Sequence, residues 1–196
     1  MKTKRLQGLS IWALVFFWVS GLTLNTQSIY HSKSTWETQD GRKASLVNLS
    51  GSDGLRGSPV VVAMLYTSCQ ASCPLTLSDL NKIKNGLSHE EQKKVRFAVF
   101  SFDSDRDKPQ HLKSFALKQG IDLLQWTFFH GSPSSVRELA ALLGIRFKKV
   151  DGGDFDHSNI ISILDPEGVI IHQQVGVRQN PAESINILRR LIEPLK

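Results

Sequence analysis

The sequence predicts a single α/β domain, and three observations lead to that class. Apolar runs rich in β-branched and aromatic residues, as in buried strands, alternate with segments whose leucines have helical spacing. Three of these helical segments begin at a proline and end at a glycine, which are the residues that favour helix starts and stops. The 196 residues, 40% hydrophobic and 21% charged, suit one globular domain with a short appendage.

The appendage is the N-terminal segment, residues 1–27. Three cationic residues (Lys2, Lys4 and Arg5) precede an apolar run over residues 11–19. This pattern predicts a signal peptide or a membrane anchor, and either one implies an exported domain on the periplasmic side of the membrane. No cysteine follows the run directly, which excludes a lipoprotein anchor.

The net charge of +6 does not indicate nucleic-acid binding. Three of these charges belong to the N-terminal segment, which leaves +3 for the rest of the chain. Basic residues are not interleaved with aromatic residues in blocks, so no nucleic-acid partner is expected. The chain also lacks a phosphate-binding glycine loop, a serine nucleophile motif and a pair of carboxylates in a catalytic frame.

The order of the predicted elements identifies the fold more closely. A polar linker is expected at residues 28–35, before a domain at 36–196 that opens with a hairpin at 36–49. Strands and helices then alternate, and an Asp-Pro-Glu-Gly turn joins the last two strands: strand 60–66, helix 74–85, strand 95–102, helix 109–120, strand 126–129, helix 133–143, strands 160–164 and 169–173, and helix 181–191. This order predicts a thioredoxin-like fold with an N-terminal hairpin extension.

Cys69 and Cys73 are the only cysteines, and they directly follow the first buried strand. The carboxyl edge of the sheet, where the loop between them would lie, is the usual location of sites in open α/β folds. Pro74 disfavours helical conformation at the residue before it, so Cys73 is expected to cap the helix. A helix N-terminus stabilises a thiolate, so we expect a lowered pKa for Cys73.

The two sulfurs allow three interpretations. A structural disulfide is the simplest in an exported protein, but closing so short a loop stabilises a fold comparatively little. A redox dithiol is the second. The third is a soft metal such as Cu(I) or Zn(II), which the three intervening residues leave room to bind. Two sulfurs and one nitrogen leave zinc a ligand short of a closed structural site.

A soft metal on two thiolates needs a third ligand, most often an imidazole. His157 is the preferred candidate because it lies in a polar segment, residues 152–159, directly before a buried strand. His130 ends another predicted strand and could lie at the same edge of the sheet. Surface positions are expected for the other four: His31, His89, His111 and His172. From the residues alone, His157 could equally be an ordinary loop histidine.

Three separated motifs resemble the Sco/SenC family of copper-binding, thioredoxin-like proteins involved in cytochrome c oxidase assembly. They are Tyr-Thr-x-Cys-x-x-x-Cys-Pro at residues 66–74, Ser-Phe-Asp with Arg-Asp and Pro at 101–109, and Asp-His-Ser at 156–158 before the turn at 165–168. The resemblance implies that Cys69, Cys73 and His157 are ligands of Cu(I) or Cu(II). It also implies a copper-accepting oxidase subunit as partner.

One of two aspartates in the second motif, Asp103 or Asp107, is expected near the site, where it would contact a ligand residue or order the loop. The alternative is that they are solvated surface acids. Copper delivery is the leading functional hypothesis. A thiol–disulfide oxidoreductase that acts on a thiol client through Cys69 and Cys73 without a stable metal is the alternative, and a binding module with a structural disulfide is the third.

Overall fold

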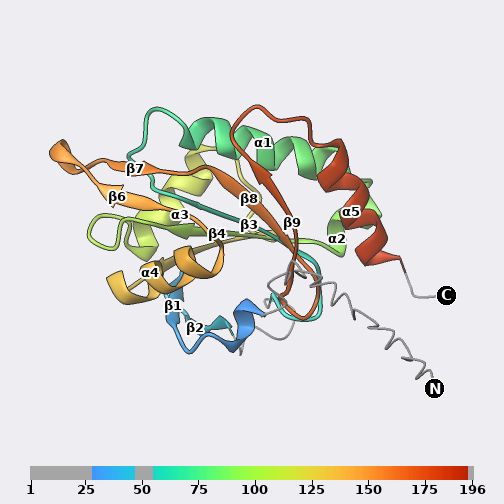
Figure 1. The fold of residues 1–196 in the computed structure, drawn as a ribbon, viewed down its shortest axis with the longest axis horizontal. Helices are drawn as coiled ribbons and strands as arrows, with labels where there is room; N and C mark the ends of the chain where they lie inside the picture. Colours follow the sequence, from blue (N-terminus) through green and yellow to red (C-terminus); the bar gives the residue numbers. More distant parts are fainter. Residues whose placement is uncertain (1–27, 47–54, 194–196) are drawn as a thin grey trace, which may run out of the picture.

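The computed structural model describes residues 28–46 and 55–193 and confirms a mixed α/β fold. Seven strands form the central sheet in the order β2-β1-β5-β4-β3-β8-β9 (Figure 1). The predicted N-terminal signal or anchor at residues 1–27 lies outside the described part. Within the described part, no helix is long and apolar enough to span a membrane.

The elements follow the predicted order with additions. The strands are β1 (Thr35–Thr38), β2 (Lys43–Ser45), β3 (Val60–Leu65), β4 (Arg96–Ser101), β5 (Trp126–Gly131), β6 (Phe147–Lys149), β7 (Phe155–His157), β8 (Ile160–Leu164) and β9 (Ile170–Val175). The α-helices are α1 (Cys73–Asn85), α2 (His89–Lys93), α3 (Pro109–Lys118), α4 (Pro133–Leu142) and α5 (Ala182–Ile192), and 3₁₀ turns occur at Ile29–His31 and Asp151–Gly153.

Strands β3, β4 and β5 are parallel, whereas β1, β2, β8 and β9 extend the sheet antiparallel at its two sides. Helix α1 lies in the connection from β3 to β4, and α3 lies in the connection from β4 to β5, so both connections advance in the same direction across the sheet. Because such connections are right-handed, both helices lie on one face of the sheet. Helix α5 lies beside α1, and α4 lies on the opposite face (Figure 1). All six residues of β3 are buried, as expected for a central strand covered on both faces.

The expected hairpin is present as β1 and β2. Gly41, with φ of +78°, turns the chain between them, and its N–H donates to the carbonyl of Thr38. Strand β1 pairs antiparallel with β5, with Trp36 opposite Gly131. The hairpin therefore extends the sheet beyond β5 and covers an edge that would otherwise be free.

The predicted linker at residues 28–35 is packed into the domain instead. Ile29 and Tyr30 are buried, and the Ile29 N–H donates to the carbonyl of Gly168 at 2.9 Å. The Ser28 hydroxyl also bonds to the carbonyl of Glu167. The prediction weighed the polar composition of the segment and gave too little weight to two large apolar side chains, whose burial fixes the segment to the turn between β8 and β9.

Helix α2 and the two strands β6 and β7 were not predicted. Helix α2 begins at a capping box in which Ser88 and Glu91 exchange side-chain-to-backbone hydrogen bonds, a signal that the sequence does contain. The small sheet of β6 and β7 has only three residues in each strand, too few to show a period of two. His157 is the last residue of β7, so it lies in a β-hairpin and is not an ordinary loop histidine.

Gly168 provides a test of the packing of residues 28–30. Its φ is +82°, and a Cβ atom there would lie 2.5 Å from the ring of Tyr30. Gly144 has a similar φ of +66° but open space around it. We expect Gly144→Ala to cost about 1–2 kcal/mol from backbone strain. Gly168→Ala should cost about 1–3 kcal/mol more, because the Tyr30 ring must move.

The measurement is urea unfolding of both variants beside the unsubstituted protein. Equal losses of unfolding free energy would show that Tyr30 does not pack against this turn as described.

Candidate metal centre

The two cysteines lie in the loop that follows β3 at the carboxyl edge of the sheet. The Cys69 N–H donates to the carbonyl of Tyr66 at 3.3 Å, which turns the chain out of the strand. Helix α1 begins at Cys73 itself, with Ser72 as the capping residue. Cys73 is therefore the first helical residue, one position inside the helix compared with the prediction from Pro74.

His157 is held at the same edge by aromatic packing. Its ring lies 4.9 Å from the ring of Phe102 and 6.1 Å from that of Tyr66, measured between centroids. Phe155, two residues before His157 in β7, packs on Tyr66 with ring centroids 5.1 Å apart, and its N–H donates to the Tyr66 hydroxyl. The β6–β7 hairpin is thus fastened to the strand ends from which the cysteine loop begins.

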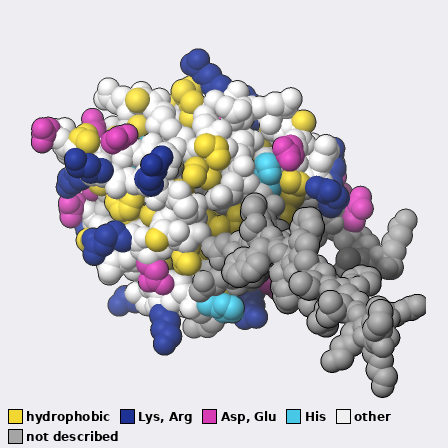
Figure 2. Space-filling model, viewed as in Figure 1, with side chains coloured by type: hydrophobic (Ala, Val, Ile, Leu, Met, Phe, Trp, Pro, Cys, Tyr) yellow, Lys and Arg dark blue, Asp and Glu magenta, His cyan; other side chains and the backbone are white. Residues whose placement is uncertain are grey.

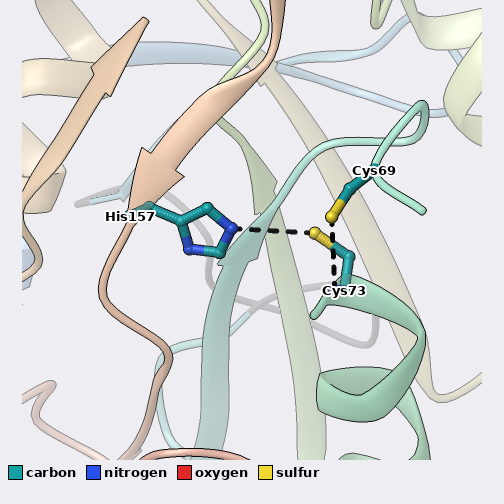
Figure 3. Close-up of side chains that lie close together, drawn as sticks. All are labelled: Cys69, Cys73 and His157. Carbon is teal, nitrogen blue, oxygen red and sulfur yellow. Dashed lines mark hydrogen bonds between the residues drawn. The ribbon is translucent and has the colours of Figure 1, made fainter. Parts of the chain in front are cut away.

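The three predicted ligands come together in space. The ligand atoms of Cys69, Cys73 and His157 all lie within 4.8 Å of one another, and Cys73 Sγ is 3.9 Å from His157 Nε2. Figure 3 shows the imidazole and both sulfurs facing a common point. Among residues 28–46 and 55–193, these three form the one group of histidine, cysteine or acidic side chains that could hold a metal ion.

The tautomer of His157 leaves Nε2, the ring nitrogen that faces Cys73, without a proton. Nδ1 lies 3.3 Å from the carbonyl oxygen of Ser158, and a carbonyl can only accept, so Nδ1 carries the proton. Nε2, which faces Cys73, therefore has a free lone pair for a metal. Burial lowers the pKa of His157 and outweighs the opposing Ser158 bond and Asp156 charge, which keeps the ring neutral at pH 7.

The acidity of the two thiols differs from the prediction. Burial raises the pKa of Cys73, and the hydrogen bond to Cys69 raises it further. Burial opposes ionisation of Cys69 too, but hydrogen bonds from the Cys73 thiol, the N–H groups of Cys73 and Ala71, and the Tyr66 hydroxyl lower its pKa. The first N–H of α1 is 3.4 Å from Cys69 Sγ, so the helix end stabilises the thiolate of Cys69 instead of that of Cys73.

Tyr66 was not singled out in the sequence beyond its place in the motif. Burial raises its pKa to about 12, so at neutral pH its hydroxyl keeps its proton and donates a hydrogen bond to Cys69. The same oxygen accepts the Phe155 N–H from β7. Tyr66 therefore connects one sulfur ligand to the strand that carries the imidazole.

Asp107 orders the cysteine loop, as one of the two aspartates was expected to do. Its buried carboxylate accepts the N–H of Thr67 at 2.9 Å and the hydroxyls of Thr67 and Ser101, each at 2.5 Å. Thr67 precedes Cys69 by two residues, so these charge-assisted bonds fix where the loop leaves β3.

Asp103 is also buried, and it forms an ion pair with Arg106. Arg106 in turn donates to the carbonyl of Gly153 in the turn between β6 and β7. The interpretation of both aspartates as surface acids is therefore wrong.

The other histidines remain outside the centre. His130 lies in β5 opposite Glu37, half-buried and beside the backbone of Asp107, but it is not part of the ligand group. His172 is half-buried and 3.9 Å from Glu183, contrary to the surface position expected for it. The remaining three are exposed: His31, His89 and His111.

The arrangement supports two kinds of chemistry. Two sulfurs and one neutral imidazole nitrogen are a ligand set for a soft metal. A thiol of lowered pKa beside one of raised pKa also forms a pair in which one sulfur attacks and the other resolves, as thiol–disulfide exchange requires.

The thiol asymmetry can be tested by alkylation. The reduced Cys73→Ser variant, which retains Cys69, should react with iodoacetamide at pH 7 more than about tenfold faster than Cys69→Ser, because the thiolate is the nucleophile. The rate for Cys69 should level off below pH 9, its usual pKa, whereas that for Cys73 should still rise above pH 9. Mass spectrometry of samples quenched at set times gives the alkylation rate of each variant as a function of pH. Equal rates, or a faster Cys73, would contradict the assignment.

The chain is similar to known proteins in sequence and in fold. The family model described as SCO1/SenC matches residues 40–193. The SCO1 protein homolog of Bacillus subtilis (strain 168) is 29% identical over 154 residues, which cover 77% of this chain and 76% of that protein.

Two solved structures share the fold. One is BsSco, described as a member of the Sco family of cytochrome c oxidase assembly proteins with a disulfide switch; it is 27% identical, with a TM-score of 0.67 over 79% of this chain and 88% of the other. The other is copper-bound ScoI of Bradyrhizobium japonicum, 22% identical, with a TM-score of 0.67 over 82% and 98% of the two chains. The family model covers most of the domain, and the chain belongs to the SCO1/SenC family.

Proposed function

We propose that this protein is a copper chaperone that holds copper on Cys69, Cys73 and His157 and passes it to an acceptor protein. The observation that carries the proposal is the convergence of the three ligand atoms within 4.8 Å from a loop, a helix start and a separate hairpin. Family membership adds support, because copper is bound in the structure of ScoI from Bradyrhizobium japonicum.

The ligand chemistry favours copper as a cargo over a permanent structural metal. Three ligands leave the metal open to a fourth from an acceptor, so copper can move by ligand exchange without first becoming free. Loading requires both thiols in the reduced form and releases their protons, so copper binding competes with disulfide formation.

The acceptor we propose is a copper-accepting subunit of cytochrome c oxidase. The support is the description of BsSco as an oxidase assembly protein, together with membership of the same family. The basic start and apolar run of residues 1–27 support an exported domain on the periplasmic side, held at the membrane or released after cleavage.

Thiol–disulfide exchange with a client protein is the second candidate function. One observation favours it: the lowered pKa of Cys69 beside the raised pKa of Cys73. Such exchange does not need the imidazole, whereas copper binding does. His157 therefore distinguishes the two candidates.

The test is a copper titration of the reduced protein against a competing chelator. Outer ligand partners alone typically contribute about 10–100-fold to metal affinity. Removal of a direct ligand in His157→Ala should therefore weaken binding by about 100-fold or more, and should change the sulfur-to-Cu(II) absorption bands. His89→Ala is the matched control, because His89 is exposed on α2 and lies outside the ligand group.

If His157→Ala titrates like His89→Ala, the metal-centre assignment is wrong. Fast reduction of a disulfide client by both variants, with no dependence on copper, would then favour the exchange function.

A further inference from the structure

A groove with an aromatic floor lies beside the metal centre, between α4 and the β6–β7 hairpin. Its volume is about 320 Å³. The rings of Phe102, Phe147 and Phe155 line it, with centroids 5.1 to 6.3 Å from Phe102, and Val136 of α4 completes the apolar wall. Phe147 and Phe155 are half-buried, so an apolar side chain could gain contact there.

The charged residues around this groove are unequally paired. Asp103 forms an ion pair with Arg106, and Asp105 forms one with Lys149 at 3.0 Å. Arg137 of α4 and Lys148 of β6 also line the groove, on opposite walls, and both are exposed. Neither has a hydrogen-bonded or ion-paired partner among residues 28–46 and 55–193.

Figure 2 views the molecule from the side on which this hairpin and α4 lie. Lys and Arg side chains surround exposed hydrophobic atoms there, with acidic side chains among them. The two acids that line the groove are engaged within the chain, so the unpaired charges among its lining residues are positive. Outside the lining, exposed Asp156 stands opposite Lys148 in the β6–β7 ladder. Positive charge around an apolar floor is complementary to a segment that carries carboxylates around an apolar side chain.

The groove and the metal centre share a wall. The ring of Phe102 forms part of the groove and lies 4.9 Å from the ring of His157. Phe155, on the same floor, packs on Tyr66, whose hydroxyl donates to Cys69. A protein segment seated in the groove would therefore place the rest of its surface next to the three ligands.

We propose that this groove docks the copper acceptor through an acidic segment of that protein, with an apolar side chain on the phenylalanine floor and carboxylates on Arg137 and Lys148. The inference rests on the proposed delivery function and adds to it the chemistry of the partner. Charges at the edge of an interface act chiefly on the rate of association, so docking here would set the speed and specificity of transfer.

The test uses charge reversal at the two unpaired cations. The variant Arg137→Glu with Lys148→Glu is compared with Lys118→Glu plus Arg190→Glu, which changes the net charge equally. Lys118 and Arg190 are exposed on α3 and α5, the helices of the other face of the sheet. Both variants should retain the copper affinity of the unsubstituted protein, because neither touches a ligand.

Two readouts use the full chain and the copper-binding domain of oxidase subunit II from the same host. The first is equilibrium binding of the two metal-free reduced proteins by calorimetry. The second is the rate of copper transfer to that domain and, separately, to a small chelator. For the groove variant we expect binding and transfer to the domain to fall about tenfold or more at low salt. Transfer to the chelator should be unchanged, and the control variant should match the unsubstituted protein.

The outcomes separate the two proposals. If copper reaches the domain equally fast from the groove variant and the control, the docking site is wrong and delivery stands. If the proteins bind through the groove but no copper moves, docking stands and delivery is wrong. If they neither bind nor transfer copper, both proposals fail.

The role of the apolar floor is tested with a competitor. The acetylated peptide Asp-Glu-Phe-Glu-Asp should slow transfer to the domain, whereas Asp-Glu-Ser-Glu-Asp at the same concentration should not. Equal inhibition by both peptides would show that charge alone acts there, and would overturn the proposed seat for an apolar side chain.

Discussion

The packing of the β6–β7 hairpin on the ends of β3 and β4 is the interaction on which the site depends. His157 is 84 residues from Cys73 along the chain, and nothing local holds it near the sulfurs. Stacking of Phe147 and Phe155 on Phe102, the Arg106 bond to Gly153, and the Lys149–Asp105 ion pair together fix the hairpin. The aromatic contacts contribute most of the stabilisation of the hairpin, because exposed ion pairs contribute little in water.

The cysteine loop is held by a different set of contacts, which Asp107 makes. Asp107 lies on the segment between β4 and α3, and its carboxylate binds both the Thr67 backbone and the Ser101 side chain. This buried carboxylate accepts three hydrogen bonds, and removal of it would leave those donors unpaired. The centre thus forms where two independently supported elements meet, and Tyr66 contacts both.

Much of the fold could be predicted from the sequence, because its main elements carry strong local signals. The apolar run of β3 and the proline and glycine boundaries of α1, α3 and α4 are such signals, and the structure has these elements close to the expected residues. The hairpin of β6 and β7 could not be predicted in this way, because its strands are stabilised by packing of Phe147 and Phe155 on Phe102, which is remote in sequence. Ile29 and Tyr30 were missed for the same reason: their packing partner, Gly168, is remote in sequence.

The structure brings the three predicted ligand residues together, but the acidity of the two thiols differs from the prediction. The helix-start argument assigned the low pKa to Cys73, and only the geometry shows that the first N–H of α1 lies within reach of the sulfur of Cys69. Burial of Cys73 then acts in the opposite direction. Pairing and burial depend on tertiary contacts, so a sequence motif gives the identity of a ligand more securely than its protonation state.

The most direct measurement of the central claim is X-ray absorption at the copper edge on the reduced, Cu(I)-loaded full chain. Coordination by Cys69, Cys73 and His157 predicts two sulfur scatterers at about 2.3 Å and one nitrogen scatterer at about 2.0 Å, distances typical of metal–thiolate and metal–imidazole bonds. The nitrogen contribution should carry the outer-shell pattern of an imidazole ring. A spectrum with sulfur scatterers alone would contradict the account, because the hairpin would then have no part in holding the metal.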